Sequence, residues 1–151
     1  MVIVHMACAL LSYLAFLVAF VAGILFLIQE RQLKRKRMGF LFHRLPPLGT
    51  LERVNVAAIG IGLVLLSAGL AFGVAGMRHV LGRWWTGDPK EYLTVALWAV
   101  YLVLWLVQVR STLRGRRVAL LSVAGFGLVL LTFMGPGEWF RSIHPYSQGG
   151  G

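Results

Sequence analysis

Four long stretches without any Asp, Glu, Lys or Arg constrain the fold of this 151-residue chain more than any other feature. A helix needs about 20 mostly apolar residues to cross the hydrocarbon core of a membrane, and each stretch meets or approaches that length. Because 58% of the residues are hydrophobic, against about 45–50% in soluble domains, we predict an all-α, polytopic membrane protein. The four predicted transmembrane helices cover residues 6–28, 55–76, 92–109 and 118–134.

These spans define the predicted domain organisation. Residues 1–146 are expected to form a single membrane domain, with connections at residues 29–54, 77–91 and 110–117. The last residues, 147–151, are expected to be a flexible tail, because they contain only Ser, Gln and Gly and chain ends of this kind have little to hold them in place.

The basic residues predict the orientation in the membrane. Most of the 15 lysines and arginines lie in the connections 29–54 and 110–117, and such connections face the cytoplasm. The connection 77–91 and both termini are then expected on the outer (periplasmic or extracytoplasmic) side of a bacterial-type cytoplasmic (inner) membrane. The basic run 31–37 contains no interleaved aromatic residue, so it is expected to contact anionic lipid and not nucleic acid.

Several histidine and tryptophan residues belong to the predicted outer side. Adjacent Trp84 and Trp85 offer two flat faces near Asp88, which suits a flat conjugated ligand such as haem. Imidazole nitrogen is a normal axial ligand of haem iron, and His5 and His144 are candidates to bind the iron from opposite sides. Two simpler interpretations stay open, because interfacial tryptophans commonly anchor the headgroup level and a histidine can simply mark the end of a span.

Other kinds of chemistry are disfavoured by what the spans lack. Transport and intramembrane catalysis generally need charged side chains inside the bundle, and none of the four spans contains one. The single cysteine, Cys8, excludes an intrachain disulfide and a cysteine-based metal cluster within this chain. The glycines at positions 69, 73 and 76 lie near one helical face and predict close packing between helices.

Several short motifs, in order and with similar spacing, resemble the cytochrome c assembly family, which includes the CcsA, CcmC and HemX-like proteins. The segments WTGDPKE and LWAVY resemble its tryptophan-rich signature and the aromatic span that follows. The remaining segments resemble its first span, first cytoplasmic loop, last basic loop and terminal histidine motif. The motifs are HMACALLSYLAF at 5–16, QER at 29–31, LPPL at 45–48, LER at 51–53, WTGDPKE at 85–91, LWAVY at 97–101, RGRRVALLSVAGF at 114–126 and IHPY at 143–146.

The resemblance implies a haem-handling membrane protein of cytochrome c biogenesis that binds and presents haem at the outer surface. It implies that His5 and His144 ligate the haem iron and that Trp84, Trp85 and Asp88 line the haem platform. Haem b would be a transient cargo, and the chain would be a haem chaperone or a cytochrome c haem-lyase subunit. The implied partners are haem, apocytochrome c, lipid and a membrane protein that supplies further helices or the apocytochrome-binding domain.

The sequence departs from the family pattern at two positions. Gly87 stands where the signature has its second Trp, and Gln108 stands where many CcsA-like members have a histidine. Two alternatives therefore accompany the first interpretation. One is a HemX-like accessory or regulatory protein of tetrapyrrole metabolism, and the other is a structural subunit of a larger membrane complex that has lost the haem site.

Overall fold

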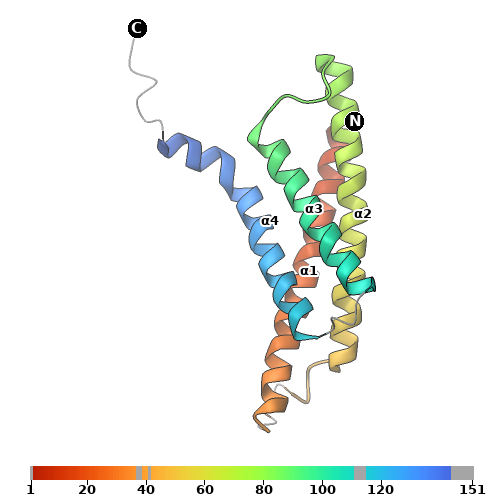
Figure 1. The fold of residues 1–151 in the computed structure, drawn as a ribbon, viewed down its shortest axis with the longest axis vertical. Coiled ribbons are helices and arrows are strands. Elements are labelled where there is room, and N and C mark those ends of the chain that lie inside the picture. Colours follow the sequence, from red (N-terminus) through yellow and green to blue (C-terminus); the bar gives the residue numbers. More distant parts are fainter. Residues whose placement is uncertain (1, 37–38, 41, 111–114, 144–151) are drawn as a thin grey trace.

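The computed structural model describes residues 2–36, 39–40, 42–110 and 115–143. Four helices follow one another in this part of the chain, which confirms the all-α prediction (Figure 1). The helices are α1 (Val2–Lys34), α2 (Leu48–Leu81), α3 (Pro89–Arg110) and α4 (Arg116–Ile143).

Three of these helices are long and apolar enough to cross a membrane. The segments are Ile3–Lys34, Leu48–Leu81 and Pro89–Arg110, and they correspond to the first three predicted spans. That α4 forms a fourth span, and which side of the membrane each terminus occupies, stay predictions. The tail predicted at 147–151 lies outside the described residues.

The helices continue well beyond the uncharged stretches. With 33 residues in α1 and 34 in α2, each is about 50 Å long at 1.5 Å per residue, against about 30 Å for the hydrocarbon core. As a result α2 includes Arg78 and His79 in its last turn, in a region predicted only as a connection. Proline and residues with positive φ mark the helix boundaries. Helix α1 is followed by Lys36 with φ 50°. Helix α2 begins after Pro47 and is followed by Gly82 with φ 65°.

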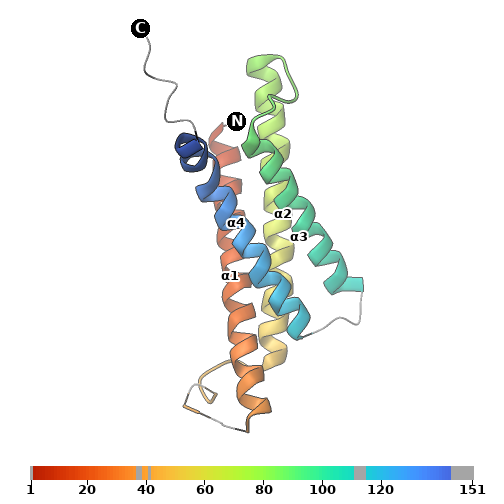
Figure 2. The same cartoon turned by 60° about the vertical axis from the view of Figure 1, so that its left-hand side comes forward.

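The four helices pack with α1 against α2 over most of their length (Figures 1 and 2). Helix α4 packs on α1 and α3, and α3 also packs on α2. The last turns of α4 lead away from the other three helices (Figure 1). The N-terminal end of α1 and the α2–α3 connection lie at one end of the bundle, and the last turns of α1 and α3 lie at the other, with the first turns of α2 and α4.

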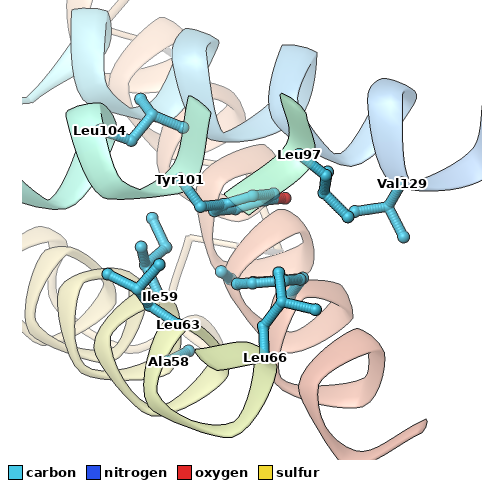
Figure 3. Close-up of a cluster of buried hydrophobic side chains, with 10 residues drawn as sticks. Ala58, Ile59, Leu63, Leu66, Leu97, Tyr101, Leu104 and Val129 are labelled. Carbon is cyan, nitrogen blue, oxygen red and sulfur yellow. The ribbon is translucent and has the colours of Figure 1, made fainter. Parts of the chain in front are cut away.

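An aromatic pair from α1 and α3 forms the centre of the core. The rings of Phe16 and Tyr101 stack at a centroid separation of 3.7 Å with 14° between their planes, and both side chains are fully buried. Figure 3 shows Tyr101 surrounded by aliphatic side chains of α2, α3 and α4. Gly62 of α2 makes room for this pair, because a Cβ at this position would lie 2.5 Å from Phe16 Cε1.

A buried polar junction also connects all four helices. Asn55 of α2 donates from Nδ2 to the Ala19 carbonyl of α1 at 2.7 Å and to Ser122 Oγ of α4 at 2.9 Å. Gln108 of α3 donates from Nε2 to Asn55 Oδ1 at 3.1 Å. Unpaired polar groups cost several kcal/mol in a bilayer, so this junction favours one arrangement of the four helices.

We expect Gly62→Ala to lower the free energy of unfolding by about 1–3 kcal/mol, the usual cost of forcing extra volume into a packed core. The added methyl group must displace the Phe16 ring and disturb its stack on Tyr101. Thermal unfolding in detergent measures the change. The control is Gly127→Ala on α4, where an added Cβ meets no atom within 4 Å; an equal loss in both variants would contradict the packing argument.

Candidate functional site

The imidazole of His5 is held by the backbone of α2. Its Nδ1 lies 2.6 Å from the Gly69 carbonyl oxygen. A carbonyl oxygen only accepts hydrogen bonds, so the proton of the neutral ring is on Nδ1 and the lone pair is on Nε2. An Nδ1–H to carbonyl hydrogen bond of this kind is the usual support of a metal-binding histidine.

Glycine on α2 provides the space that the His5 ring occupies. A Cβ at Gly73 would lie 2.9 Å from His5 Nδ1 and 3.0 Å from His5 Cε1, which is too close for the ring in its present position. One turn earlier, a Cβ at Gly69 would lie 3.5 Å from the Cβ of Cys8. The prediction of close helix packing is confirmed at Gly69 and Gly73 and stays a prediction at Gly76. At Gly73 the group that packs closely is the candidate ligand itself.

A cavity of about 410 Å³ lies beside His5 at this end of the bundle. Such a volume is within the usual range for small-molecule sites, about 300–1,000 Å³. Its lining comes from the start of α1, the last turns of α2, the α2–α3 connection and the first turns of α3, and most of it is apolar. The lining residues are His5, Leu70, Phe72, Gly73, Val74, Gly76, Met77, Val80, Trp84, Trp85, Lys90, Glu91, Thr94 and Val95.

The structure thus brings three of the five predicted site residues to one cavity. Trp84 and Trp85 keep 59% and 42% of their surface exposed. The Trp85 and Tyr92 rings make a T-shaped contact, with centroids 5.1 Å apart and 74° between the planes. The Arg78 guanidinium carbon lies 4.2 Å from the centre of the Trp84 ring. Both indoles are therefore held by contacts that leave much of their surface accessible.

Asp88 has a local structural role at the start of α3. Its Oδ1 accepts a hydrogen bond from the Lys90 backbone N–H at 2.9 Å, which is the usual contact of a helix N-cap. Pro89 follows at the first helical position, where its missing N–H costs nothing. Asp88 is not among the described residues that line the cavity, whereas Lys90 and Glu91, which it helps to position, are.

Glu91 fixes the backbone of the α2–α3 connection through hydrogen bonds. Its carboxylate accepts hydrogen bonds from the backbone N–H groups of Thr86 and Gly87, both at 3.2 Å, and from the Thr86 hydroxyl. Gly87 has φ 83°, a conformation that side-chain-bearing residues rarely adopt. In this chain the backbone shape therefore favours glycine at the position where the family signature has Trp.

Neither His79 nor His144 is among the described residues that line the cavity beside His5. His144 lies outside the described residues, so its pairing with His5 stays a prediction. His79 lies in the last turn of α2 and lines an open hollow of about 740 Å³ that shares Trp84 with the cavity beside His5. Sequence reasoning did not assign Tyr92, Lys90 or Glu91 to the site, although Lys90 and Glu91 belong to the WTGDPKE motif. Their contribution depends on how the connection folds back onto α3.

We expect Gly73→Ala to weaken the hydrogen bond between His5 and the Gly69 carbonyl, because the added methyl group requires the ring to move. The shift costs about 1–3 kcal/mol and releases the preference for the Nδ1–H tautomer. Nitrogen NMR of histidine-labelled protein reads this tautomer directly. Gly49→Ala, with no atom within 4 Å of its Cβ, is the control, and an unchanged His5 spectrum in Gly73→Ala would contradict the expectation.

Comparison with known proteins confirms the resemblance to the cytochrome c assembly family. The sequence model of a family described as "Cytochrome C assembly protein" matches residues 1–144. An uncharacterised 28.8 kDa protein of Azospirillum brasilense is 34% identical over 87% of this chain and 48% of its own length. The cytochrome c biogenesis protein CcsA of Synechococcus elongatus is 31% identical over 64% of this chain and 30% of its own length.

A CcsA protein of Prochlorococcus marinus is 28% identical over 95% of this chain and 53% of its own length. The chain thus spans about half or less of the length of these curated relatives. No solved structure matches the chain.

Proposed function

We propose that this chain, which belongs to the cytochrome c assembly protein family, serves cytochrome c biogenesis by binding haem in the cavity beside His5 and presenting it at the membrane surface. One observation carries the proposal: a histidine with its Nδ1 proton bound to a backbone carbonyl lines an apolar cavity together with two exposed tryptophans. Relatives named as cytochrome c biogenesis proteins support the biological setting.

His5 is the proposed axial ligand. The hydrogen bond to Gly69 leaves the Nε2 lone pair free, fixes the ring orientation and raises the basicity of the imidazole. His144 is proposed as the second ligand, on the opposite face of the macrocycle. Two histidine ligands give low-spin haem iron, which has a characteristic absorption spectrum.

The aromatic and charged residues suit the rest of the haem. Trp84 and Trp85 offer apolar faces on which a flat macrocycle packs. Lys90 lines the same cavity and provides a cation for the carboxylates that haem carries at one edge. Asp88 contributes by fixing the start of α3, which sets the position of Lys90.

In this proposal haem is a transient cargo and the chain is a haem chaperone or haem-lyase subunit. Its work is positional: it holds haem at the surface, near the thiols of apocytochrome c that form the covalent bonds. The described α2–α3 connection, residues 82–88, is short, so we place most of the apocytochrome-binding surface on a partner membrane protein. The distribution of basic residues supports an outer-side location of the cavity in a bacterial-type cytoplasmic membrane.

An absorption spectrum of the purified protein with added haem, oxidised and reduced, tests the proposal. We expect sharp low-spin bands for the wild type, and at least a roughly tenfold loss of haem affinity for His5→Ala and for His144→Ala. His43→Ala is the control, because His43 lies in the α1–α2 connection and packs on Phe42. Free imidazole is expected to restore the low-spin spectrum to His5→Gly, which separates loss of a ligand from misfolding.

Two outcomes would contradict the proposal. One of them is a wild-type chain whose spectrum with added haem, oxidised and reduced, stays that of free haem. The other is a His5→Ala variant that keeps the wild-type spectrum and affinity, which would place haem away from the cavity.

The tryptophans make a separate prediction. We expect Trp85→Leu to weaken haem binding by about three- to tenfold and Trp85→Phe by less, since an aromatic contact contributes about 0.5–1.5 kcal/mol beyond its buried area. The low-spin bands are expected to remain, because the iron ligands are unchanged. The matched control is Trp105→Phe on α3, whose indole packs near Gly60 in the core; an equal effect there would argue against stacking on Trp85.

A further inference from the structure

The last turns of α1 carry a second hollow, at the opposite end of the bundle from the cavity beside His5. It has a volume of about 430 Å³ and is lined by Ile28, Arg31, Gln32, Arg35 and Gly39. We propose that Arg31 and Arg35 bind the phosphate of an anionic phospholipid headgroup in this hollow. The proposal is independent of haem binding.

Helix geometry places the lining residues on one face. Positions 31, 32 and 35 lie three, four and seven residues after position 28, a spacing that follows one stripe of a helix surface. Arg35 lies one residue beyond α1, and its backbone N–H continues the helical turn by donating to the Arg31 carbonyl at 3.1 Å. Figures 1 and 2 show the last turns of α1 extending beyond the ends of the other three helices. The stripe is therefore open to the surroundings, and Gly39 leaves space beside it because an added Cβ there meets no atom within 4 Å.

Among the described residues, no carboxylate pairs with Arg31 or Arg35 in the hollow. Within the described part of the chain the ion pair at this helix end is Lys34 with Glu30, at 2.8 Å, so it does not involve Arg31 or Arg35. Like charges four residues apart on a helix repel each other, and an anion between them removes that repulsion. Planar guanidinium groups also bind phosphate oxygens through paired hydrogen bonds.

Depth favours a lipid over a free anion. Residues 6–28 contain no charge, and Ile28 keeps 39% of its surface exposed, so Ile28 marks the edge of the hydrocarbon core. At 1.5 Å per residue, Arg31 lies about 4.5 Å and Arg35 about 10 Å farther along the axis. The headgroup layer is about 5–8 Å thick on each side, so Arg31 starts within this layer and Arg35 starts just beyond it. The long side chain of Arg35 can extend back toward the membrane, which brings both guanidinium groups to the phosphate of a lipid whose chains pass Ile28.

The neighbouring connection has the chemistry of a membrane interface. Phe40 keeps 74% of its surface exposed, and the Arg44 guanidinium carbon lies 4.8 Å from the centre of its ring. An exposed aromatic ring paired with a cation directly after Gly39 is suited to the boundary between headgroups and acyl chains. A water-exposed phosphate site would gain nothing from this ring.

Native mass spectrometry of the full chain, titrated with phosphatidylglycerol, phosphatidylcholine and inorganic phosphate in separate experiments, tests the site. We expect tighter binding of phosphatidylglycerol than of phosphatidylcholine. Arg31→Gln and Arg35→Gln are each expected to weaken phosphatidylglycerol binding by about fivefold, and the double variant by roughly thirtyfold. Arg31→Lys and Arg35→Lys keep the charge and are expected to lose less. Arg116→Gln, at the start of α4 and the same end of the bundle, is expected to bind like the wild type.

Each alternative result has a definite meaning. If Arg116→Gln weakens binding as much as Arg31→Gln, the contact is diffuse surface attraction and the site is refuted. If inorganic phosphate binds as tightly as phosphatidylglycerol, the hollow takes a free anion and the lipid assignment is wrong. Arg31 and Arg116 are exposed on helix surfaces, and Arg35 is exposed in the turn directly after α1. Thermal unfolding of each variant verifies that the chain still folds.

Discussion

The close approach of α1 to α2 depends on glycine at three positions along α2, and both the core and the candidate site depend on this approach. Gly62 admits the Phe16 ring that stacks on Tyr101, and Gly73 admits the His5 ring. Between them, the Gly69 carbonyl is near enough to accept the His5 proton. In a membrane, where lipid is as apolar as a leucine core, such close packing is a main source of helix association. The same contact therefore stabilises the bundle and sets the tautomer of the candidate ligand.

Polar contacts inside the spans complement this packing. Asn55 joins α2 to α1, α3 and α4, and the Trp98 indole N–H donates to Ser67 Oγ at 2.8 Å, joining α3 to α2. A hydrogen bond between membrane helices contributes only about 0.6 kcal/mol on average. Such bonds fix rotation and register more than they add stability. Gln108, noted in the sequence as a departure from a family histidine, is a member of this junction.

Sequence reasoning identified the helices and part of the site for a physical reason: long uncharged stretches have few alternatives to helix in a membrane. It also placed His5, Trp84 and Trp85 at one end of the molecule, because topology alone decides which end a residue occupies. It did not give the helix ends or the roles of Asp88 and Glu91. Those depend on hydrogen bonds to particular backbone N–H groups. For Asp88 the Asp-Pro pair does carry a helix-start signal, whereas the contacts of Glu91 depend on how the connection folds.

The α2–α3 connection explains why the two tryptophans stay available to a ligand. Gly82 ends α2 with φ 65° and Gly87 turns the chain with φ 83°, so the indoles lie on a short segment between two sharp turns. Glu91 of α3 accepts hydrogen bonds from the backbone N–H groups at the end of that segment. These bonds restrain the backbone and do not involve the indole rings. Trp85 makes a T-shaped contact with Tyr92 and keeps 42% of its surface exposed. Burying a large aromatic face is favourable, and rings held in this way present accessible apolar surface beside the cavity that His5 lines.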